Sequence, residues 1–356
     1  MVKNESRFSR LMKRPEMLCI VALLLLLVYN LFFTSGFFNI EIKDGHLYGS
    51  LIDILRRGAP LYFMAMGMTL VIATGSTDVS VGAIAAISAS TAARLIGGEF
   101  DYSSGAENLS QTPFPIAILV ALGVATLCGV WNGFLVAQLG IQALVATLML
   151  QVAGRGIAQL ITDGLIITVY YKPFFVFGSG YLFGLPISLY IVAAVAFFIS
   201  IFTRKTSYGL FLESAGSSRS ASRYVGLKVK RTIWIAFAIS GLMAGIAGIL
   251  IASEVKSADA NNAGLYYELD AILSVVLGGN SMKGGRFSLA GSLIGAVFVQ
   301  ALTTTIYMKG VPSETILVVK ALAVVIVGLI QVTDFHAFFG RIKNWFSKKP
   351  GLEAGR

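Results

Sequence analysis

Apolar stretches that are long enough to cross a membrane alternate with short polar gaps along this chain of 356 residues. A transmembrane helix needs about 20 apolar residues to cross a hydrocarbon core of about 30 Å. The stretches run over residues 17–33, 57–75, 79–96, 114–136, 141–161, 183–203, 233–253, 268–279, 288–307 and 315–332. The pattern predicts an all-α integral membrane protein, a polytopic bundle of about ten transmembrane helices with some broken or re-entrant segments.

The basic residues predict the orientation of these helices. Nineteen of the 28 Lys and Arg residues lie in alternate gaps: the first segment, residues 204–232, residues 280–287 and the tail. Short cytoplasmic loops retain Lys and Arg, so we expect both termini inside the cell. The gaps expected outside are 34–56, 97–113, 162–182 and 254–267. The expected organisation is a basic cytoplasmic N-terminus (1–16), a transmembrane domain (17–333) with a cytoplasmic loop (204–232), and a basic cytoplasmic tail (334–356).

Composition favours the membrane class over a soluble enzyme or a nucleic-acid-binding protein. The chain is 56% hydrophobic and 13% charged, whereas a soluble domain has about 25% charged residues. Residues 108–154 and 173–203 contain no charged side chain. The net charge of +10 is spread over gaps between spans, where it sets topology and contacts lipid head groups. We therefore expect the lipid bilayer, and no nucleic acid, as a partner.

Motifs for catalysis, metal binding and cofactor binding are absent from the sequence. The two His residues, His46 and His336, lie in different gaps, and no His, Cys or Asp cluster has metal-ligand spacing. Neither the P-loop pattern G-x-x-x-x-G-K-S/T nor a G-x-S-x-G elbow occurs. Cys19 and Cys128 lie within apolar stretches and are expected to act as hydrophobic residues. The sequence predicts no enzyme, no metal and no cofactor.

Two interruptions of the apolar pattern mark candidate parts of a translocation path. Residues 74–82 break one apolar stretch, and the Gly-rich residues 277–285 follow a crossing of only about twelve residues. Irregular backbone at membrane depth is tolerated where it is buried in protein or lines a wet cavity. Such breaks are therefore the best pointers to a binding site in a transporter sequence.

Small residues predict close contacts between helices. Small residues at helix-contact spacing let two helix backbones approach each other within a membrane. Two spans contain such glycines: Gly241, Gly245, Gly248, Gly291 and Gly295.

Intramembrane carboxylates are few. Asp78 is the one expected nearest a cavity, and Glu268 and Asp270 begin a span. Carriers driven by protons or sodium usually contain several such groups for coupling. We therefore expect energy from another source, with a self-sufficient secondary sugar carrier or facilitator as the alternative.

The basic loop 204–232 contains one segment with helical character. Residues 213–224 are expected to form a short helix at the membrane surface, which Gly226 would terminate. The alternative is a solvated basic loop.

Three blocks resemble the permeases of sugar-importing ABC transporters of the ribose, xylose and arabinose type. They are residues 60–84, residues 220–231 with the span that contains 239–248, and residues 267–295. The resemblance extends from about residue 15 to 333, and residues 44–56 are most similar to the galactofuranose-type members. Two positions depart from the family pattern: Ser76-Thr-Asp-Val-Ser80 replaces Gly-Ile-Asp-Leu-Ser, and Ser220-Ala-Ser222 replaces Glu-Ala-Ala.

The resemblance implies a permease subunit of the bacterial inner membrane and a set of partners. These are a second permease subunit, a cytoplasmic ABC ATPase subunit and a periplasmic sugar-binding protein. It also implies that residues 213–226 form a coupling helix that fits a groove of the ATPase. The candidate coupling residues are Glu213, Ala215, Gly216, Ser218, Arg219, Ala221, Ser222, Arg223 and Gly226.

Sugar is expected to pass along uncharged polar groups. The candidate residues of this path are Thr69, Thr74, Ser76, Thr77, Asp78, Ser80 and Arg155. Asp78 has two interpretations, an acceptor for a sugar hydroxyl or a structural partner in helix packing. Arg155 is similarly a functional candidate because it lies within the membrane, or a residue that caps or pairs within the bundle.

Overall fold

The computed structural model describes residues 15–43, 45–97, 100–101, 106–107, 112–312 and 315–322. Residues 1–308 form one compact unit and residues 309–356 another. The expected last span, 315–332, is helical over 315–322, and its remainder lies outside the described residues, as do the expected N-terminal segment 1–14 and the tail 334–356. The following paragraphs concern the first unit.

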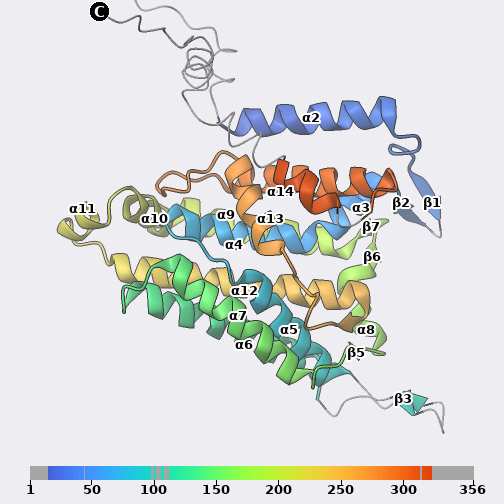
Figure 1. The fold of residues 1–356 in the computed structure, drawn as a ribbon, viewed down its shortest axis with the longest axis horizontal. Helices are drawn as coiled ribbons and strands as arrows, with labels where there is room; N and C mark the ends of the chain where they lie inside the picture. The colour runs from blue at the N-terminus through green and yellow to red at the C-terminus, as the bar shows by residue number, and fades with distance from the viewer. Residues whose placement is uncertain are drawn as a thin grey trace, which may run out of the picture. The chain divides into compact units, whose positions relative to one another are not determined.

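Helices occupy the other nine predicted stretches (Figure 1). They are α2 (Pro15–Phe33), α4 (Ala59–Ala73), α5 (Val81–Ile96), α6 (Phe114–Ala137), α7 (Ala143–Ile161), α9 (Ile187–Lys205), α12 (Val229–Val255), α13 (Tyr267–Leu277) and α14 (Leu289–Met308). Within the described residues, α6, α7, α9, α12 and α14 are long and apolar enough to cross a membrane. The all-α membrane class is confirmed, and the count of ten crossings stays a prediction.

Short helices and short strands lie in the gaps between the predicted spans. Four short helices are α3 (Ser50–Arg57), α8 (Lys172–Ser179), α10 (Ser207–Ser217) and α11 (Arg219–Tyr224). Four antiparallel pairs are β1 (Glu41–Lys43) with β2 (His46–Tyr48), β3 (Phe100–Asp101) with β4 (Ala106–Glu107), β5 (Ile167–Thr168) with β8 (Ser257–Ala258), and β6 (Tyr181–Leu182) with β7 (Leu185–Pro186).

The connections alternate between two ends of the bundle. Figure 1 shows α10 and α11 at one end, and β1, β2, β5 and α8 at the other. The first end also holds the turn between α6 and α7, because Lys230 at the start of α12 contacts Gln138 there. Of the gaps rich in Lys and Arg, residues 204–232 and 280–287 lie at this end, and the basic residues of the other two gaps lie outside the described residues.

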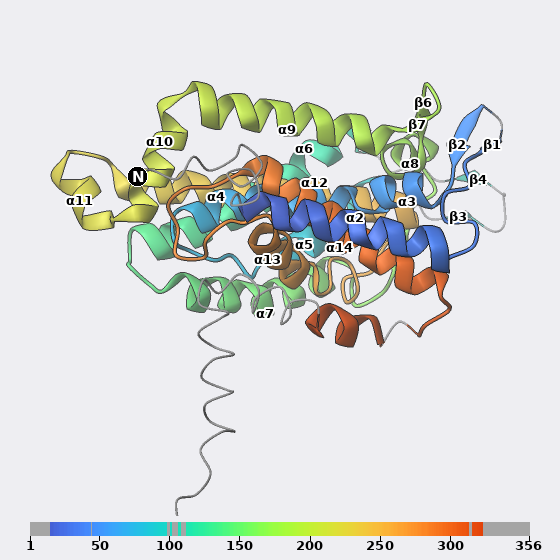
Figure 2. The ribbon, with the colours of Figure 1, turned by 90° about the horizontal axis from the view of Figure 1, so that it is seen from above.

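α4, α5 and α12 form the centre of the bundle. Every residue of α4 is buried, and α12 packs against α4, α5 and α6. In Figure 2, α12 and α4 lie between α9 on one side and α7 on the other. The outer helices carry exposed large apolar side chains, such as Leu127 on α6 and Phe198 on α9. This pattern fits a bundle whose outer surface meets lipid.

Small residues allow the central helices to touch through their backbones, as the sequence predicts. A Cβ added at Gly248 would lie 2.1 Å from the carbonyl oxygen of Ala85 in α5, and one at Gly241 would lie 2.6 Å from that of Ala125 in α6. A Cβ at Gly295 would lie 2.0 Å from the carbonyl oxygen of Ser274. Since lipid tails provide no hydrophobic drive, such close van der Waals packing stabilises the bundle.

The alternation predicts which surface residues an impermeant reagent can reach. Phe183, in the β6–β7 turn, and Tyr224, at the end of α11, are 92% and 91% exposed and belong to opposite ends of the bundle. In a background with both native cysteines replaced by Ala, Phe183→Cys should react with an impermeant maleimide in intact cells. Tyr224→Cys should react only after permeabilisation. Equal labelling of both cysteines in intact cells would contradict the topology.

Candidate functional site

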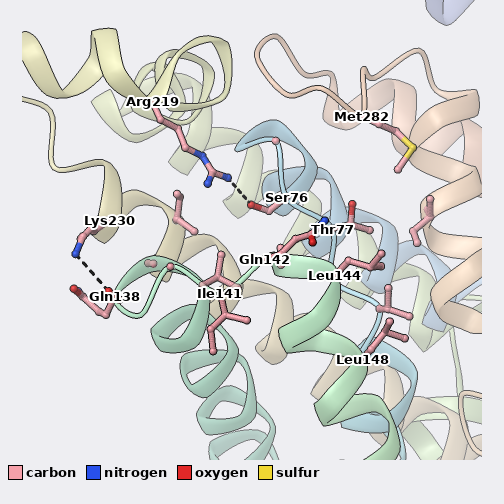
Figure 3. Close-up of a pocket in the computed structure, with 18 of the residues that line it drawn as sticks. Ser76, Thr77, Gln138, Ile141, Gln142, Leu144, Leu148, Arg219, Lys230 and Met282 are labelled. Carbon is pink, nitrogen blue, oxygen red and sulfur yellow. Dashed lines mark hydrogen bonds between the residues drawn. The ribbon is translucent and has the colours of Figure 1, made fainter.

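A cavity of about 910 Å³ lies at the end of the bundle that holds the predicted cytoplasmic gaps (Figure 3). Its volume is within the range of small-molecule sites. Its wall includes the turn between α6 and α7, the break between α4 and α5, α11, and the start of α12. Its polar lining residues are Ser76, Thr77, Gln138, Gln142, Arg219, Arg223 and Lys230, and no Asp or Glu of the described residues lines it. The cavity therefore combines uncharged hydrogen-bonding groups with a positive rim.

The break between α4 and α5 forms one wall of the cavity. α4 ends at Ala73, and Gly75 has a φ of +71°, a left-handed conformation that favours glycine and ends the helix. α5 begins only at Val81. In between, Ser76 and Thr77 line the cavity (Figure 3). The interruption predicted from the polar run is confirmed, and it brings two of the predicted path residues to the cavity.

Asp78 points away from the cavity into the packed interior. Its side chain is fully buried, while its neighbours Thr77 and Val79 line the cavity. Oδ1 accepts hydrogen bonds from the Ser80 amide at 3.1 Å and the Ser80 hydroxyl at 2.6 Å. Oδ2 accepts one from the Ser240 hydroxyl at 2.9 Å. A buried carboxylate is costly without such partners, and here they join the break to α12.

Ser80 extends this cluster to a further helix. The side-chain amide of Asn132 in α6 donates to the Ser80 hydroxyl oxygen at 2.8 Å. Ser80 is buried and does not line the cavity. Asp78, Ser80, Asn132 and Ser240, named here the septum, therefore form one buried polar layer that connects the break with α6 and α12.

Two other predicted path residues lie in packed helix contacts. Thr69 is buried in α4, where its hydroxyl is 2.7 Å from the Ser292 hydroxyl of α14 and 2.6 Å from the Ala65 carbonyl oxygen. Thr74 is buried and donates to the Val71 carbonyl at 2.7 Å. The structure does not bring either side chain to the cavity.

Arg155 lies near the end of α7 that is remote from the cavity residues Leu144 and Leu148. Its Nη1 lies 3.2, 3.3 and 2.6 Å from the carbonyl oxygens of Ala260, Asn261 and Ala263. These contacts tie α7 to the connection before α13. The sequence leaves two roles open for Arg155, a functional residue of the path or a residue that caps or pairs within the bundle. These contacts agree with the second role.

The expectation of a single helix over residues 213–224 is wrong. α10 ends at Ser217, and Ser218 has an extended conformation, with a φ of −161°. The Ser218 hydroxyl accepts a hydrogen bond from the Ala221 amide at 3.3 Å and so caps α11. The predicted stop at Gly226 is confirmed, because Gly226 has a φ of +83°.

The predicted coupling residues divide into an inward and an outward group. Ala215 and Ser222 are buried, and a Cβ at Gly216 would lie 1.9 Å from the Ala73 carbonyl oxygen. Glu213 and Ser218 are partly exposed. The outward group consists of exposed residues: Arg219, Ala221, Arg223 and Gly226. Tyr224 and Val225 beside them are 91% and 76% exposed and were not predicted.

The sequence analysis missed several polar residues of the site. Gln138 and Gln142 flank the tight turn between α6 and α7 and line the cavity. Asn132 and Ser240 complete the septum. A detectable signal existed only for Asn132, the one Asn or Gln within the apolar stretch 114–136. Ser240 gives no such signal, because many serines within helices bond to the backbone of their own helix.

Comparison with known proteins assigns a family. The profile of the family described as "Branched-chain amino acid transport system / permease component" matches residues 50–329. The chain is 45% identical to the galactofuranose transporter permease YtfT of Escherichia coli K12, over 91% of this chain and 92% of that protein.

More distant relatives agree with this result. The fructose import permease FruF of Bifidobacterium longum is 34% identical over 94% of this chain and 92% of its own length. The ribose import permease RbsC of Escherichia coli K12 is 31% identical over 89% of this chain and 93% of its own length. No solved structure matches the chain. The cavity, the broken helices and the match over residues 50–329 lead to one conclusion: the chain belongs to this family of transport permeases.

Proposed function

We propose that this chain is the transmembrane permease subunit of an ATP-driven ABC importer for a monosaccharide in the bacterial inner membrane. The observation that carries the proposal is the 45% identity, over nearly the whole of both chains, to a galactofuranose transporter permease. Fructose and ribose import permeases follow at lower identity. Galactofuranose or a sugar of similar shape is therefore the proposed cargo.

The chemistry of the cavity supports a sugar over an amino acid. Ser76, Thr77, Gln138 and Gln142 offer donors and acceptors that suit sugar hydroxyls. An amino acid carries an ammonium group, which binds best beside a carboxylate, and within the part of the chain that the structure describes no Asp or Glu lines the cavity. A neutral polyol is thus the better match, although the family description names branched-chain amino acids.

The proposed transport mechanism is alternating access. The cavity opens at the end predicted to face the cytoplasm, and we assign the gate to the septum of Asp78, Ser80, Asn132 and Ser240, which is buried next to the cavity residues Thr77 and Val79. We take this arrangement as a state with the internal side open. Import would require the septum to separate while sugar passes, and then to form again behind it.

The proposed partners follow from the two ends of the bundle. Tyr224 and Val225, which are strongly exposed at the end of α11, would dock a cytoplasmic ATPase, which would supply the P-loop that this sequence lacks. A periplasmic sugar-binding protein would deliver sugar at the end that carries the β-hairpins. A second permease subunit would cover part of the exposed apolar surface.

Reconstituted transport tests this function. In proteoliposomes that contain the permease with an ABC ATPase and a sugar-binding protein, labelled galactofuranose should accumulate in an ATP-dependent manner. Ribose and fructose should accumulate less, and leucine should not accumulate. An ATPase with its P-loop Lys replaced should abolish uptake. Uptake at the same rate without the ATPase would contradict the proposal and favour a secondary carrier.

The septum predicts a graded effect of Asp78 variants on uptake. Asp78→Leu removes every hydrogen bond of the carboxylate, and bonds to a charged group contribute about 1.5–3 kcal/mol each, so uptake should fall by about tenfold or more. Asp78→Asn retains an acceptor oxygen and should lose less.

Asp163→Asn is the control, because Asp163 is an exposed carboxylate near the other end of α7. It should transport like the wild type. Wild-type uptake by Asp78→Leu, at equal abundance and with normal membrane insertion, would show that the carboxylate is dispensable.

The exposed Tyr224 at the end of α11 predicts where the ATPase binds. Tyr224→Asp removes an exposed aromatic anchor, and such anchors contribute about 2 kcal/mol or more, so ATPase binding should weaken by about thirtyfold. Phe183→Asp is the matched control, because Phe183 is equally exposed at the other end. Co-purification of the ATPase reports both variants, and equal retention in both would place the docking surface elsewhere. Gly216 is unsuitable for this test, since any side chain there would clash within the permease.

A further inference from the structure

Arg219 is the cavity residue that contacts the break between α4 and α5. Its Nη2 lies 3.0 Å from the Ser76 hydroxyl oxygen and 3.3 Å from the Thr74 carbonyl oxygen. Figure 3 shows its guanidinium group extending from α11 across the cavity mouth to Ser76. A guanidinium group suits this role because it is always charged and presents several donors in a fixed plane.

The break that Arg219 holds also carries the septum. Ser76 is two residues before Asp78, and Asp78 is two residues before Ser80. Hydrogen bonds continue from Asp78 to Ser240 in α12 and from Ser80 to Asn132 in α6. A continuous path of hydrogen bonds and short backbone segments therefore runs from α11 at the surface to the packed centre of the bundle.

α11 is fixed to α10, and α10 to the break. The Ser222 hydroxyl donates to the Ser214 carbonyl at 2.7 Å and joins the two short helices. α10 approaches the end of α4 through Gly216, which lies against the Ala73 carbonyl oxygen. That same oxygen accepts a hydrogen bond from the Gly285 amide at 3.0 Å. Both broken segments thus meet α10 and α11 at one place, so displacement of α11 acts on both.

We propose that Arg219 is a positioning residue for transport, which holds the α4–α5 break in place from the ATPase-docking segment and transmits the movement of that segment to the septum. This inference rests on the proposed function of the chain as an ATP-driven permease. While the ATPase leaves α11 in the observed position, Arg219 keeps Ser76 against the cavity wall. When the ATPase displaces α11, Arg219 pulls on the break and separates Asp78 from Ser240.

Arg223 provides a matched control on the same helix. It also lines the cavity and carries the same charge, and within the described residues its side chain makes no hydrogen bond or ion pair. Arg219→Gln and Arg223→Gln therefore remove equal charge from one rim, and only the first removes the contact with the break. If the cations acted only through their positive field, the two variants would behave alike.

The first test measures sugar transported per ATP hydrolysed, in proteoliposomes with the ATPase and the binding protein. Arg219→Gln should bind the ATPase normally and hydrolyse ATP, but transport about tenfold less sugar per ATP, the loss expected from one charge-assisted hydrogen bond. Arg223→Gln should match the wild type. Ser76→Ala should show a smaller loss of sugar transported per ATP, because the Thr74 carbonyl remains as an acceptor for Arg219.

The second test needs neither sugar nor ATPase. Hydrogen exchange of the amides of residues 74–80 in the purified permease should be faster in Arg219→Gln than in the wild type, and unchanged in Arg223→Gln. Equal exchange in all three proteins, or equal loss of transport per ATP in both arginine variants, would overturn the inference. Failure of the wild type to transport any sugar would contradict the proposed function and leave the exchange result as the test of Arg219.

Discussion

Backbone groups inside a membrane need partners within the protein, and this constraint determines where the α4–α5 break can lie. The Val79 amide donates to the Thr147 hydroxyl of α7 at 3.2 Å, and the Ser80 amide donates to Asp78 at 3.1 Å. On the other side of the break, the Thr74 carbonyl accepts from Arg219. An interruption with such partners is stable only where several elements converge. The cavity lies at this place because the elements that support the break also surround it.

Because the central helices pack closely, we expect movement to occur at the two irregular segments between helices. Gly248 and Gly241 bring α12 into backbone contact with α5 and α6, where no added methyl group fits. Densely packed helices resist gradual deformation, so they move as rigid bodies about irregular segments. The short α13 and the connection of residues 278–288 provide the second such segment, beside the first. In the proposed mechanism, alternating access therefore depends on a few residues in two short stretches.

Local features of the sequence predicted the apolar helices, both breaks and the helix stop at Gly226, because hydropathy and glycine act within a few residues. Contacts between distant segments escaped prediction. Ser240 and Asp78 are 162 positions apart in the chain. The sequence does not show that Ser240 lies on the face of α12 that meets Asp78, because the packing of the helices determines this face. The split between α10 and α11 was missed because Ser218 is an ordinary residue until its hydroxyl caps a helix. The placement of Asp78 at a path and the orientation of both termini stay predictions.

The contacts of Ser76 explain what its departure from the family pattern changes in the structure. Where the resemblance implies Gly-Ile, this chain has Ser76 and Thr77, and both line the cavity. A glycine at position 76 would leave Arg219 only the Thr74 carbonyl as an acceptor, whereas the Ser76 hydroxyl provides the shorter contact, at 3.0 Å. The same substitution thus adds a hydroxyl to the cavity and strengthens the hold of α11 on the break. Sugar contact and coupling to the ATPase would then depend on adjacent atoms of one segment, so a change of sugar specificity at position 76 would also change coupling.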